Sequence, residues 1–294
     1  MSMLEFQGLV GEAPSFRRLL HAARLVANTD VSLLLIGEAG TGKESLAREI
    51  HRLGVRRDRS FVLLPVAGLS ADDLVTALDE AFASASGGSL FIDEVAELPP
   101  PGQARLLYWL AGPGGGVRIM AATRHDLWER VRSGAFREDL YYRLCVVPLE
   151  LPSLRERVQD IGLLLDHFLA LAAATHGLPT PRFSLTAQRQ LRRYAWPGNA
   201  RELRNFCERM VILRPGEDLG PENLPWEIRQ GEMADGEAPV FKLPASGIDL
   251  QVLEVDFIRQ ALALAGGNKS RAARLLGLTR DTLLYRLEKY LIKA

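Results

Sequence analysis

The chain has 294 residues, and its 36 basic and 36 acidic side chains give a formal net charge of zero, which excludes a whole-molecule attraction to nucleic acid or to a membrane surface. Its two cysteines, Cys145 and Cys207, lie singly in apolar stretches, which argues against a disulfide or metal framework. Because no apolar run approaches the ~20 residues of a membrane span and the first residues do not form a signal peptide, we expect a cytoplasmic protein with no membrane contact.

Five short apolar runs in the first half of the chain predict strands at residues 31–37, 61–67, 89–93, 117–123 and 146–151. Helical patterns lie between them, and Ser70 with Asp73 forms a capping pattern at the start of one. Strands that alternate with helices and are apolar almost throughout are typical of a parallel sheet covered on both faces. Residues 1–151 are therefore predicted to form an α/β domain.

The rest of the chain predicts helices. Residues 152–228 are expected to form an all-α subdomain, because no strand pattern follows Pro152. Residues 229–248 are rich in Pro, Gly and acidic residues, which is typical of an exposed linker. A last helical unit is expected at residues 249–294.

The sequence GEAGTGKE, residues 37–44, follows the first predicted strand and opens a helix. In that context backbone N–H groups and a helix N-terminus bind phosphate. The match to G-x-x-x-x-G-K-[ST] is imperfect, because Glu44 stands where a hydroxyl normally holds Mg²⁺. The predicted nucleotide-binding residues are Gly37, Glu38, Ala39, Gly40, Thr41, Gly42, Lys43 and Glu44.

A buried strand that ends in two carboxylates, SLFIDE (89–94), supports hydrolysis. Asp93 is predicted to hold Mg²⁺ through water, and Glu94 to polarise the attacking water. The alternative is an ordinary strand that runs into an acidic turn.

Several segments together resemble the bacterial enhancer-binding proteins, the AAA+ activators of sigma-54 transcription. They are GEAGTGKE, ASGGSLFIDE (85–94), FREDLYYRL (136–144), LPSLRER (151–157) and WPGNARELRN (196–205), in the family's order over nearly the whole chain. The resemblance implies an AAA+ P-loop fold with a helical lid, ATP and Mg²⁺ as cofactors, and a homo-oligomer between a dimer and a hexamer. Glu commonly follows the P-loop lysine in that family, so Glu44 is compatible with it.

The resemblance also implies roles for single residues. Lys43 would bind the β- and γ-phosphates, Thr123 would report on the γ-phosphate, and Arg201 would be the lid's sensor arginine. Arg137 and Arg143 match arginine fingers, which are offered to the nucleotide of a neighbouring subunit and are worth about 10³–10⁵ in rate elsewhere. Each arginine taken alone would instead be a solvated surface charge.

The chain departs from the family in the segments that contact sigma-54 and that restrain the catalytic Glu. Family members carry an insertion with a Gly-Ala-Phe-Thr-Gly-Ala tip that contacts sigma-54, whereas here only residues 67–86, about one helix, lie between FVLLPV and GGSLFIDE. A second pore-facing loop is reduced to AGPGGG (111–116). The family's Asn that restrains the catalytic Glu is replaced by Pro65, which has no side-chain donor and no N–H. We therefore expect no standard sigma-54 contact, and hydrolysis that is slow or uncoupled from a partner.

Residues 266–290 predict two helices separated by a tight turn at Gly277 and Leu278, and they resemble a Fis-type helix-turn-helix that binds double-stranded DNA. Its second helix would enter the major groove, and bases outnumber acids locally. The inward-facing residues are predicted to be Ala272, Ala273, Leu275, Leu276, Leu283, Leu284 and Leu287. The predicted DNA-binding residues are Lys269, Arg271, Thr279, Arg280, Asp281, Thr282, Tyr285, Arg286 and Lys289.

The alternative for this unit is a helical hairpin used only for dimerisation, and the preceding helix is expected to pair with its twin. Three functions stay open. They are a transcription regulator without the usual sigma-54 grip, an orthodox sigma-54 activator ATPase, and a nucleotide-bound scaffold without turnover. RNA polymerase holoenzyme is the expected partner, with its sigma form open. Because Leu9-Val10-Gly11 matches the start of the AAA+ domain, we expect no receiver or ligand-sensing domain before it.

Overall fold

The computed structural model describes residue 6 and residues 8–112, 116–229 and 250–290. The chain divides into two compact units, Met1–Ala234 and Asp235–Ala294, and each is described by itself. The predicted linker at 229–248 lies outside the described residues, apart from Arg229.

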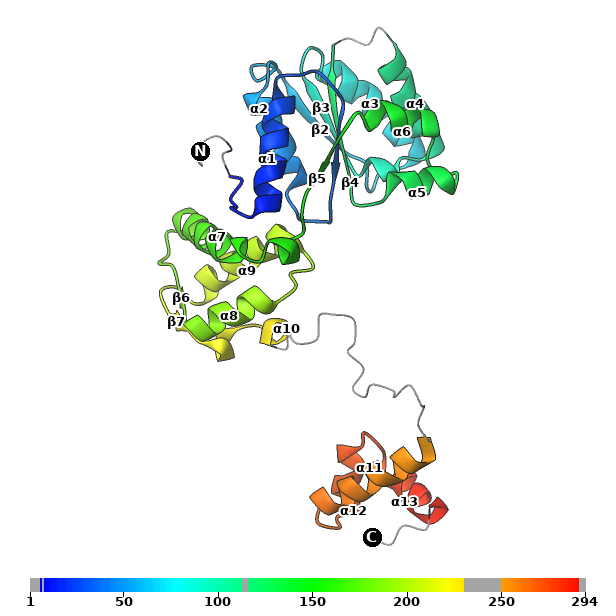
Figure 1. The fold of residues 1–294 in the computed structure, drawn as a ribbon, viewed down its shortest axis with the longest axis vertical. Helices are drawn as coiled ribbons and strands as arrows, with labels where there is room; N and C mark the ends of the chain where they lie inside the picture. Colours follow the sequence, from blue (N-terminus) through cyan, green and yellow to red (C-terminus); the bar gives the residue numbers. More distant parts are fainter. Residues whose placement is uncertain (1–5, 7, 113–115, 230–249, 291–294) are drawn as a thin grey trace. The chain divides into compact units, whose positions relative to one another are not determined.

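The first unit contains a five-stranded parallel sheet in the order β2-β3-β4-β1-β5 (Figure 1). The strands are β1 (Leu33–Ile36), β2 (Phe61–Pro65), β3 (Ser89–Asp93), β4 (Arg118–Thr123) and β5 (Val147–Glu150). The predicted parallel sheet is confirmed, and each strand falls within one of the predicted runs.

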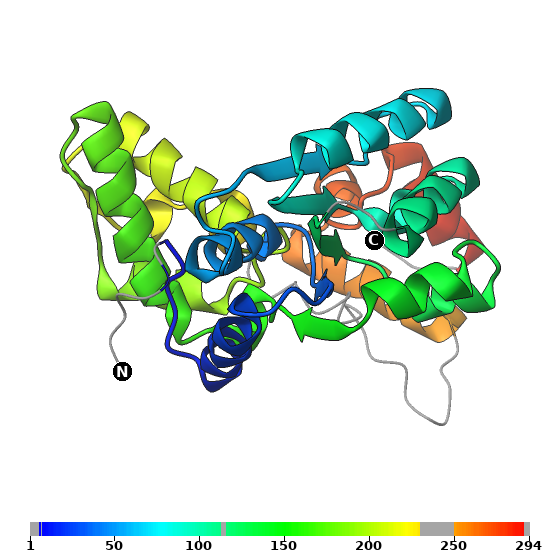
Figure 2. The same ribbon diagram turned by 90° about the horizontal axis from the view of Figure 1, so that it is seen from above.

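Helices cover both faces of this sheet, as Figures 1 and 2 show. Alternate residues of β1 explain why: Leu33 and Leu35 pack in one core with α1 and α2, whereas Leu34 packs in the other with α3 to α6. Side chains of a strand point to opposite faces in turn, so a fully apolar strand needs a cover on each side. The helices are α1 (Pro14–Ala27), α2 (Lys43–Leu53), α3 (Ala71–Ser84), α4 (Pro100–Ala111), α5 (Leu127–Arg132) and α6 (Glu138–Leu144).

The connection from β2 to β3 consists of the single helix α3 with short turns at its ends. The predicted capping pattern is confirmed, because the Ser70 hydroxyl accepts a hydrogen bond from the N–H of Asp73 at 3.2 Å. Every residue of this connection is described, and α3 is its one helix.

A helical subdomain follows the sheet. It contains a 3₁₀ turn η2 (Leu154–Arg157) and the helices α7 (Asp160–His176), α8 (Leu185–Arg193), α9 (Asn199–Leu213) and α10 (Trp226–Arg229). Its core gathers around the fully buried Trp196 and Phe206. The sequence did not predict the two-residue strands β6 (Arg182–Phe183) and β7 (Asp218–Leu219), which pair in parallel.

The second unit has three described helices, α11 (Leu250–Leu264), α12 (Lys269–Leu275) and α13 (Arg280–Lys289). Its core contains Ala272, Ala273, Leu283 and Leu287, as predicted, with Leu276 packed against them. The expectation for Leu275 is wrong, because this side chain is 55% exposed. A helix turns by about 100° per residue, which returns Leu276 to the face of Ala272 and Ala273 and points Leu275 away from it. Leu284 is half-buried.

Among the described helices of both units, none is long and apolar enough to cross a bilayer.

Candidate functional site

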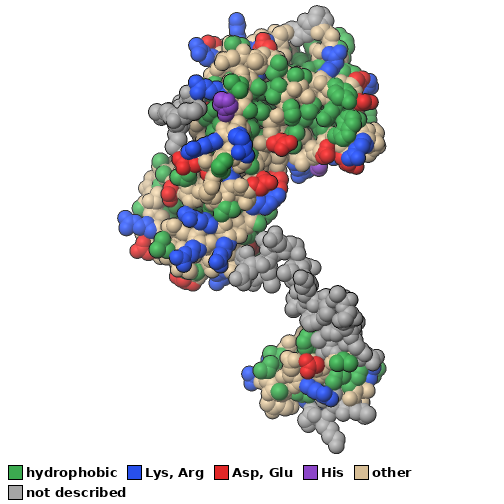
Figure 3. All heavy atoms as spheres, in the orientation of Figure 1, with side chains coloured by type: hydrophobic (Ala, Val, Ile, Leu, Met, Phe, Trp, Pro, Cys, Tyr) green, Lys and Arg blue, Asp and Glu red, His purple; other side chains and the backbone are tan. Residues whose placement is uncertain are grey.

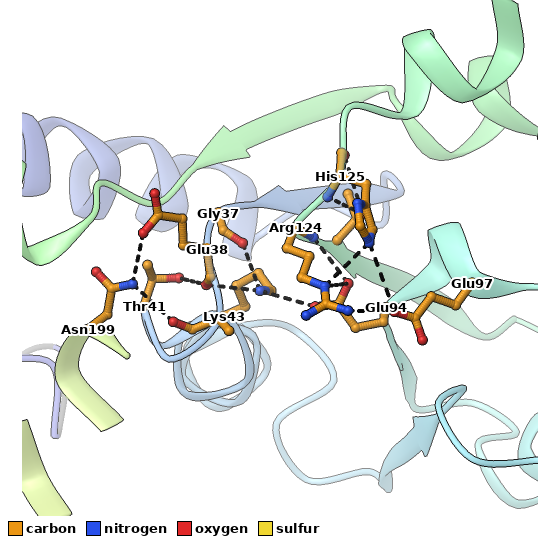
Figure 4. A network of polar contacts seen from close by, with 11 residues as sticks. Gly37, Glu38, Thr41, Lys43, Glu94, Glu97, Arg124, His125 and Asn199 are labelled. Atoms are coloured by element: carbon orange, nitrogen blue, oxygen red, sulfur yellow. Dashed lines mark hydrogen bonds and ion pairs between the residues drawn. The ribbon is translucent and has the colours of Figure 1, made fainter. Parts of the chain in front are cut away.

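The loop between β1 and α2 forms the predicted cradle (Figure 4). Gly40 and Gly42 adopt φ angles of 77° and 103°, which residues with a Cβ rarely adopt. The helix α2 begins directly afterwards at Lys43. Loop N–H groups at the start of a helix favour an anion. The Glu44 carboxylate pairs with Arg48 one turn further along α2 at 2.8 Å, and its predicted role in nucleotide binding stays a prediction.

The Lys43 side chain is a buried cation, with 7% of its surface exposed. Its Nζ donates hydrogen bonds to the carbonyl oxygens of Gly37 at 2.8 Å and Glu38 at 3.2 Å. It also lies 3.5 Å from Oε1 of Glu94. A buried ammonium needs anionic or carbonyl acceptors, and here the two carbonyl oxygens and the Glu94 carboxylate supply them.

The two carboxylates at the end of β3 differ in environment. Burial, followed by the charge of Glu94, raises the pKa of Asp93 above its ordinary value. Glu94 has a φ of 56°, in the left-handed region, at the start of the 3₁₀ turn η1 (Val95–Glu97). Its Oε2 accepts a hydrogen bond from the N–H of Arg124 at 3.2 Å. Both oxygens of the candidate base are therefore engaged.

Arg124 and His125 add a polar group that the sequence did not single out (Figure 4). The Arg124 guanidinium lies 3.0 Å from Glu97 and 4.0 Å from Glu94. The register places Pro65 opposite Asp93, and Pro65 has no side-chain donor. The partners that hold Glu94 thus come from Lys43 and Arg124.

Thr123 is the last residue of β4, is fully buried, and lies opposite Ile36 of β1. Its carbonyl oxygen accepts a hydrogen bond from the N–H of Gly37 at 3.1 Å, so it adjoins the cradle. Its hydroxyl accepts from the N–H of His125 at 3.0 Å. This position is compatible with the predicted sensor role, which stays a prediction.

The two candidate arginine fingers lie elsewhere on the chain. Arg137 pairs with Asp139 at 2.7 Å, and Arg143 donates to the carbonyl oxygen of Leu110 at 3.0 Å. The backbone N–H of Arg137 donates to the buried Gln103 side chain at 2.9 Å, a contact that the sequence did not predict. The side chains of Arg137 and Arg143 are both exposed, at the start and near the end of α6.

The start of α9 lies directly on the cradle. The N–H of Arg201 donates to the carbonyl oxygen of Gly40 at 3.3 Å, and the Asn199 amide donates to the carbonyl oxygen of Ala39 at 3.0 Å. A cavity of about 620 Å³ opens beside this contact, and Ala39, Arg201 and Arg209 line part of it. The sequence missed Asn199, although it lies in the quoted WPGNARELRN segment.

The second unit presents most of its candidate DNA-binding residues to solvent. Lys269, Arg271 and Arg280 are exposed, and Tyr285 is 66% exposed. The Thr279 hydroxyl instead caps α13 by accepting from the N–H of Thr282 at 3.2 Å.

Three further candidates complete this surface. Arg286 pairs with Glu254 at 2.5 Å, so it is partly neutralised. The Lys289 ammonium lies 5.0 Å from the centre of the Tyr290 ring. Asp281 lies in α13, but its side chain is outside the described part of the structure.

Family models account for almost the whole chain. The model of the sigma-54 interaction domain matches residues 10–154, the model of the AAA+ ATPase lid domain matches residues 155–239, and the model of bacterial regulatory proteins of the Fis family matches residues 250–290.

Individual proteins agree with these matches. The transcriptional regulatory protein ZraR of Salmonella typhimurium is 39% identical over 96% of this chain and 68% of its own length. The DNA-binding transcriptional regulator NtrC of Azospirillum brasilense is 36% identical over 94% of this chain and 68% of its own length. The crystal structure of NtrX from Brucella abortus with ADP superimposes with a TM-score of 0.71, at 30% identity, over 97% of this chain and 70% of that one.

The raised pKa of Asp93 predicts a stability effect. Ionising Asp93 costs more in the folded than in the unfolded chain, so its charge destabilises the fold above the folded pKa. We expect Asp93→Asn to raise the melting temperature of the nucleotide-free protein at pH 7.5, in a chelator, by about 2 °C. The gain should shrink as the pH falls through the folded pKa. Asp58→Asn, at a side chain 89% exposed, is the control, and equal behaviour of the two variants would contradict the prediction.

Proposed function

The chain belongs to the sigma-54 activator family of bacterial transcriptional regulators, and from this membership we propose a DNA-binding regulator that binds ATP and acts without the standard sigma-54 contact. The observation that carries the nucleotide site is the buried Lys43, whose Nζ donates to the carbonyl oxygen of Gly37 in a glycine-containing loop at the start of a helix, the context in which phosphate is bound elsewhere. Crystals of the relative NtrX with ADP and with ATP support nucleotide as the ligand class.

The cradle fits a triphosphate with its metal. The loop supplies N–H groups, Lys43 supplies a cation for the phosphate oxygens, and Asp93 supplies a carboxylate of the kind that Mg²⁺ prefers. When bound, Mg²⁺ would neutralise charge on the phosphates. Glu94 would orient the attacking water, and Arg201 would approach the phosphates from the lid, since its backbone already contacts Gly40.

Arg137 and Arg143 would serve the nucleotide of a second copy. Exposed aromatic side chains occur on the same helices: Tyr142, which precedes Arg143 in α6, is 59% exposed, and Tyr108 in α4 is 62% exposed. Figure 3 shows apolar side chains gathered over the part of the α/β domain where Figure 1 places α3, α4 and α6. Exposed apolar area near surface arginines supports a homo-oligomeric contact here.

The missing sigma-54 grip is supported by the connection between β2 and β3. It consists of α3 with short turns, and its length leaves no residues for a projecting loop. In the family that insertion makes the contact, so its absence from this connection favours a regulator that reaches polymerase in another way or modulates a relative.

A second candidate function is a nucleotide-bound scaffold without turnover. It is favoured by Glu94, since Lys43 and the N–H of Arg124 each engage one of its carboxylate oxygens. These contacts stabilise the ionised carboxylate, which makes Glu94 a weaker base toward a proton from water.

Replacing Lys43 tests the nucleotide site. We expect Lys43→Ala to weaken ADP binding by about 100-fold, because a charge-assisted contact to phosphate is lost in a buried site. Titration calorimetry measures this, and Lys269→Ala in the second unit is the control. If wild type and Lys43→Ala release phosphate equally slowly, the protein is a nucleotide-bound scaffold without turnover. If the two proteins bind ADP with equal affinity, the proposed nucleotide site is wrong.

The DNA contact makes separate predictions for two cations. Lys269→Ala should weaken binding about equally for all sequences and reduce the salt dependence by about one charge. Arg280→Ala, at the first residue of α13, should relax sequence preference. Selection of duplexes from a random pool followed by affinity measurements at several salt concentrations separates the two effects. Arg214→Ala in the lid is the control, and no loss with either variant would favour a dimerisation hairpin.

The missing grip predicts the outcome of transcription in vitro. At promoters next to mapped binding sites, we expect this protein with ATP to produce no open complexes with sigma-54 holoenzyme. A sigma-54 activator that carries the Gly-Ala-Phe-Thr-Gly-Ala insertion serves as the positive control on its own promoter. Open complexes that depend on ATP and on Lys43 would establish the orthodox activator instead.

A further inference from the structure

Three side chains from distant parts of the sequence meet on the phosphate cradle. Asn199 begins α9, Arg155 lies in η2, and Glu38 is the second residue of the cradle (Figure 4 labels Glu38 and Asn199). The Glu38 carboxylate accepts hydrogen bonds from both terminal nitrogens of Arg155, one of them at 2.9 Å, and from the Asn199 amide at 3.1 Å. The lid is thereby joined to the loop that would hold phosphate.

Asn199 is fully buried and uses both ends of its amide. Its oxygen accepts from the N–H of Leu154 at 2.7 Å, and its nitrogen donates to Glu38 and to the carbonyl oxygen of Ala39 at 3.0 Å. Its φ of 52° is in the left-handed region, where Asn and Asp are enriched among residues with a Cβ. One side chain therefore fixes the cradle, η2 and the first turn of α9 together.

The charge of Glu38 strengthens this arrangement. Hydrogen bonds from Arg155, and then from Asn199, lower the pKa of Glu38, so the carboxylate is ionised at neutral pH. A bidentate guanidinium–carboxylate contact is directional, which sets the position of the loop as well as holding it.

The backbones of the cradle and lid also touch. A Cβ built on Gly40 would lie 2.1 Å from the carbonyl oxygen of Gly198, so no side chain fits between them. The cradle and the lid are therefore in direct backbone contact, and the N–H of Arg201 donates to the Gly40 carbonyl oxygen at the same place.

We propose that Glu38, Arg155 and Asn199 are positioning residues that form a latch between cradle and lid, so that the loop N–H groups and Arg201 face the phosphates of a nucleotide together. The latch rests on the proposed nucleotide site and adds how that site is assembled. It acts on phosphate groups through the loop, and not on the base or ribose. Phosphate binding and lid position are then coupled, since each favours the same loop conformation.

An isosteric exchange tests the latch. Asn199→Asp keeps the acceptor for Leu154 and tolerates the left-handed backbone, but it removes both donated hydrogen bonds and places a second carboxylate against Glu38. We expect about tenfold weaker binding of ADP, the effect of one lost hydrogen bond to a charged partner, and unchanged binding of adenosine, which has no phosphate. Competition against a fluorescent nucleotide measures both.

Restoring the contact with reversed polarity is the second arm. In the double variant Glu38→Gln/Asn199→Asp, the glutamine amide can donate to the new carboxylate, so ADP should bind more tightly than to Asn199→Asp alone. Glu208→Gln removes the same charge from an exposed pair with His176, on the lid, and should change nothing. Equal weakening for ADP and adenosine, or no recovery in the double variant, would overturn the latch.

Hydrogen exchange of the nucleotide-free protein separates this inference from the nucleotide site. Asn199→Asp should accelerate amide exchange in residues 37–43 as well as in residues 196–203, because each segment holds the other. Faster exchange in the lid segment alone would refute the latch, whatever the protein binds. A wild-type protein that shows coupled exchange but no ADP binding would instead reject the nucleotide site.

Discussion

One buried cation sets the conditions for the candidate site. Lys43 opens α2, and its ammonium turns back onto the loop that precedes it, where two carbonyl oxygens and Glu94 surround it. Burying an ammonium is costly unless acceptors replace the lost water, so the loop must keep the conformation that points those carbonyls inward. The positive φ angles of Gly40 and Gly42 make that conformation possible. A phosphate group bound at this loop would give the Lys43 ammonium a second anionic partner, which would weaken its ion pair with Glu94.

Backbone strain is concentrated around the same place. Among the described residues, the non-glycine residues with positive φ are Glu94, Trp196 and Asn199. Glu94 lies against Lys43, Asn199 lies on the cradle, and Trp196 begins the turn that leads into Asn199. Such conformations persist only where surrounding contacts compensate for them, and here those contacts are the buried Trp196 ring, its hydrogen bond to Leu191 and the three bonds of Asn199. These contacts hold the lid turn in one defined conformation.

The sequence predicted what depends on local pattern. The parallel sheet, the cradle and the cap at Ser70 follow from apolar runs, glycine spacing and capping chemistry within a few residues. It could not predict the hydrogen bond between Asn199 and Glu38, which are 161 residues apart, because hydrophobic periodicity carries no information on a tertiary contact. The engagement of Glu94 by Arg124 and the outward direction of Leu275 were missed for related reasons: one depends on where two strands end side by side, the other on the phase of a short helix.

The two halves of the proposed site share one helix. Glu94 is followed by η1 and then by α4, and α4 carries Gln103, whose side chain donates to the carbonyl oxygens of Leu98 and Ala135 and accepts from the N–H of Arg137. The last turn of α4 supplies the carbonyl oxygen that holds Arg143. Gln103 is 2% exposed, so these bonds are not easily exchanged for water. Glu94, through η1, and Arg137, through Gln103, are therefore both connected to the first turn of α4, whereas Arg143 contacts its last turn. One helix thus relates the residue that would orient water in one subunit to the arginines that would reach the nucleotide of the next.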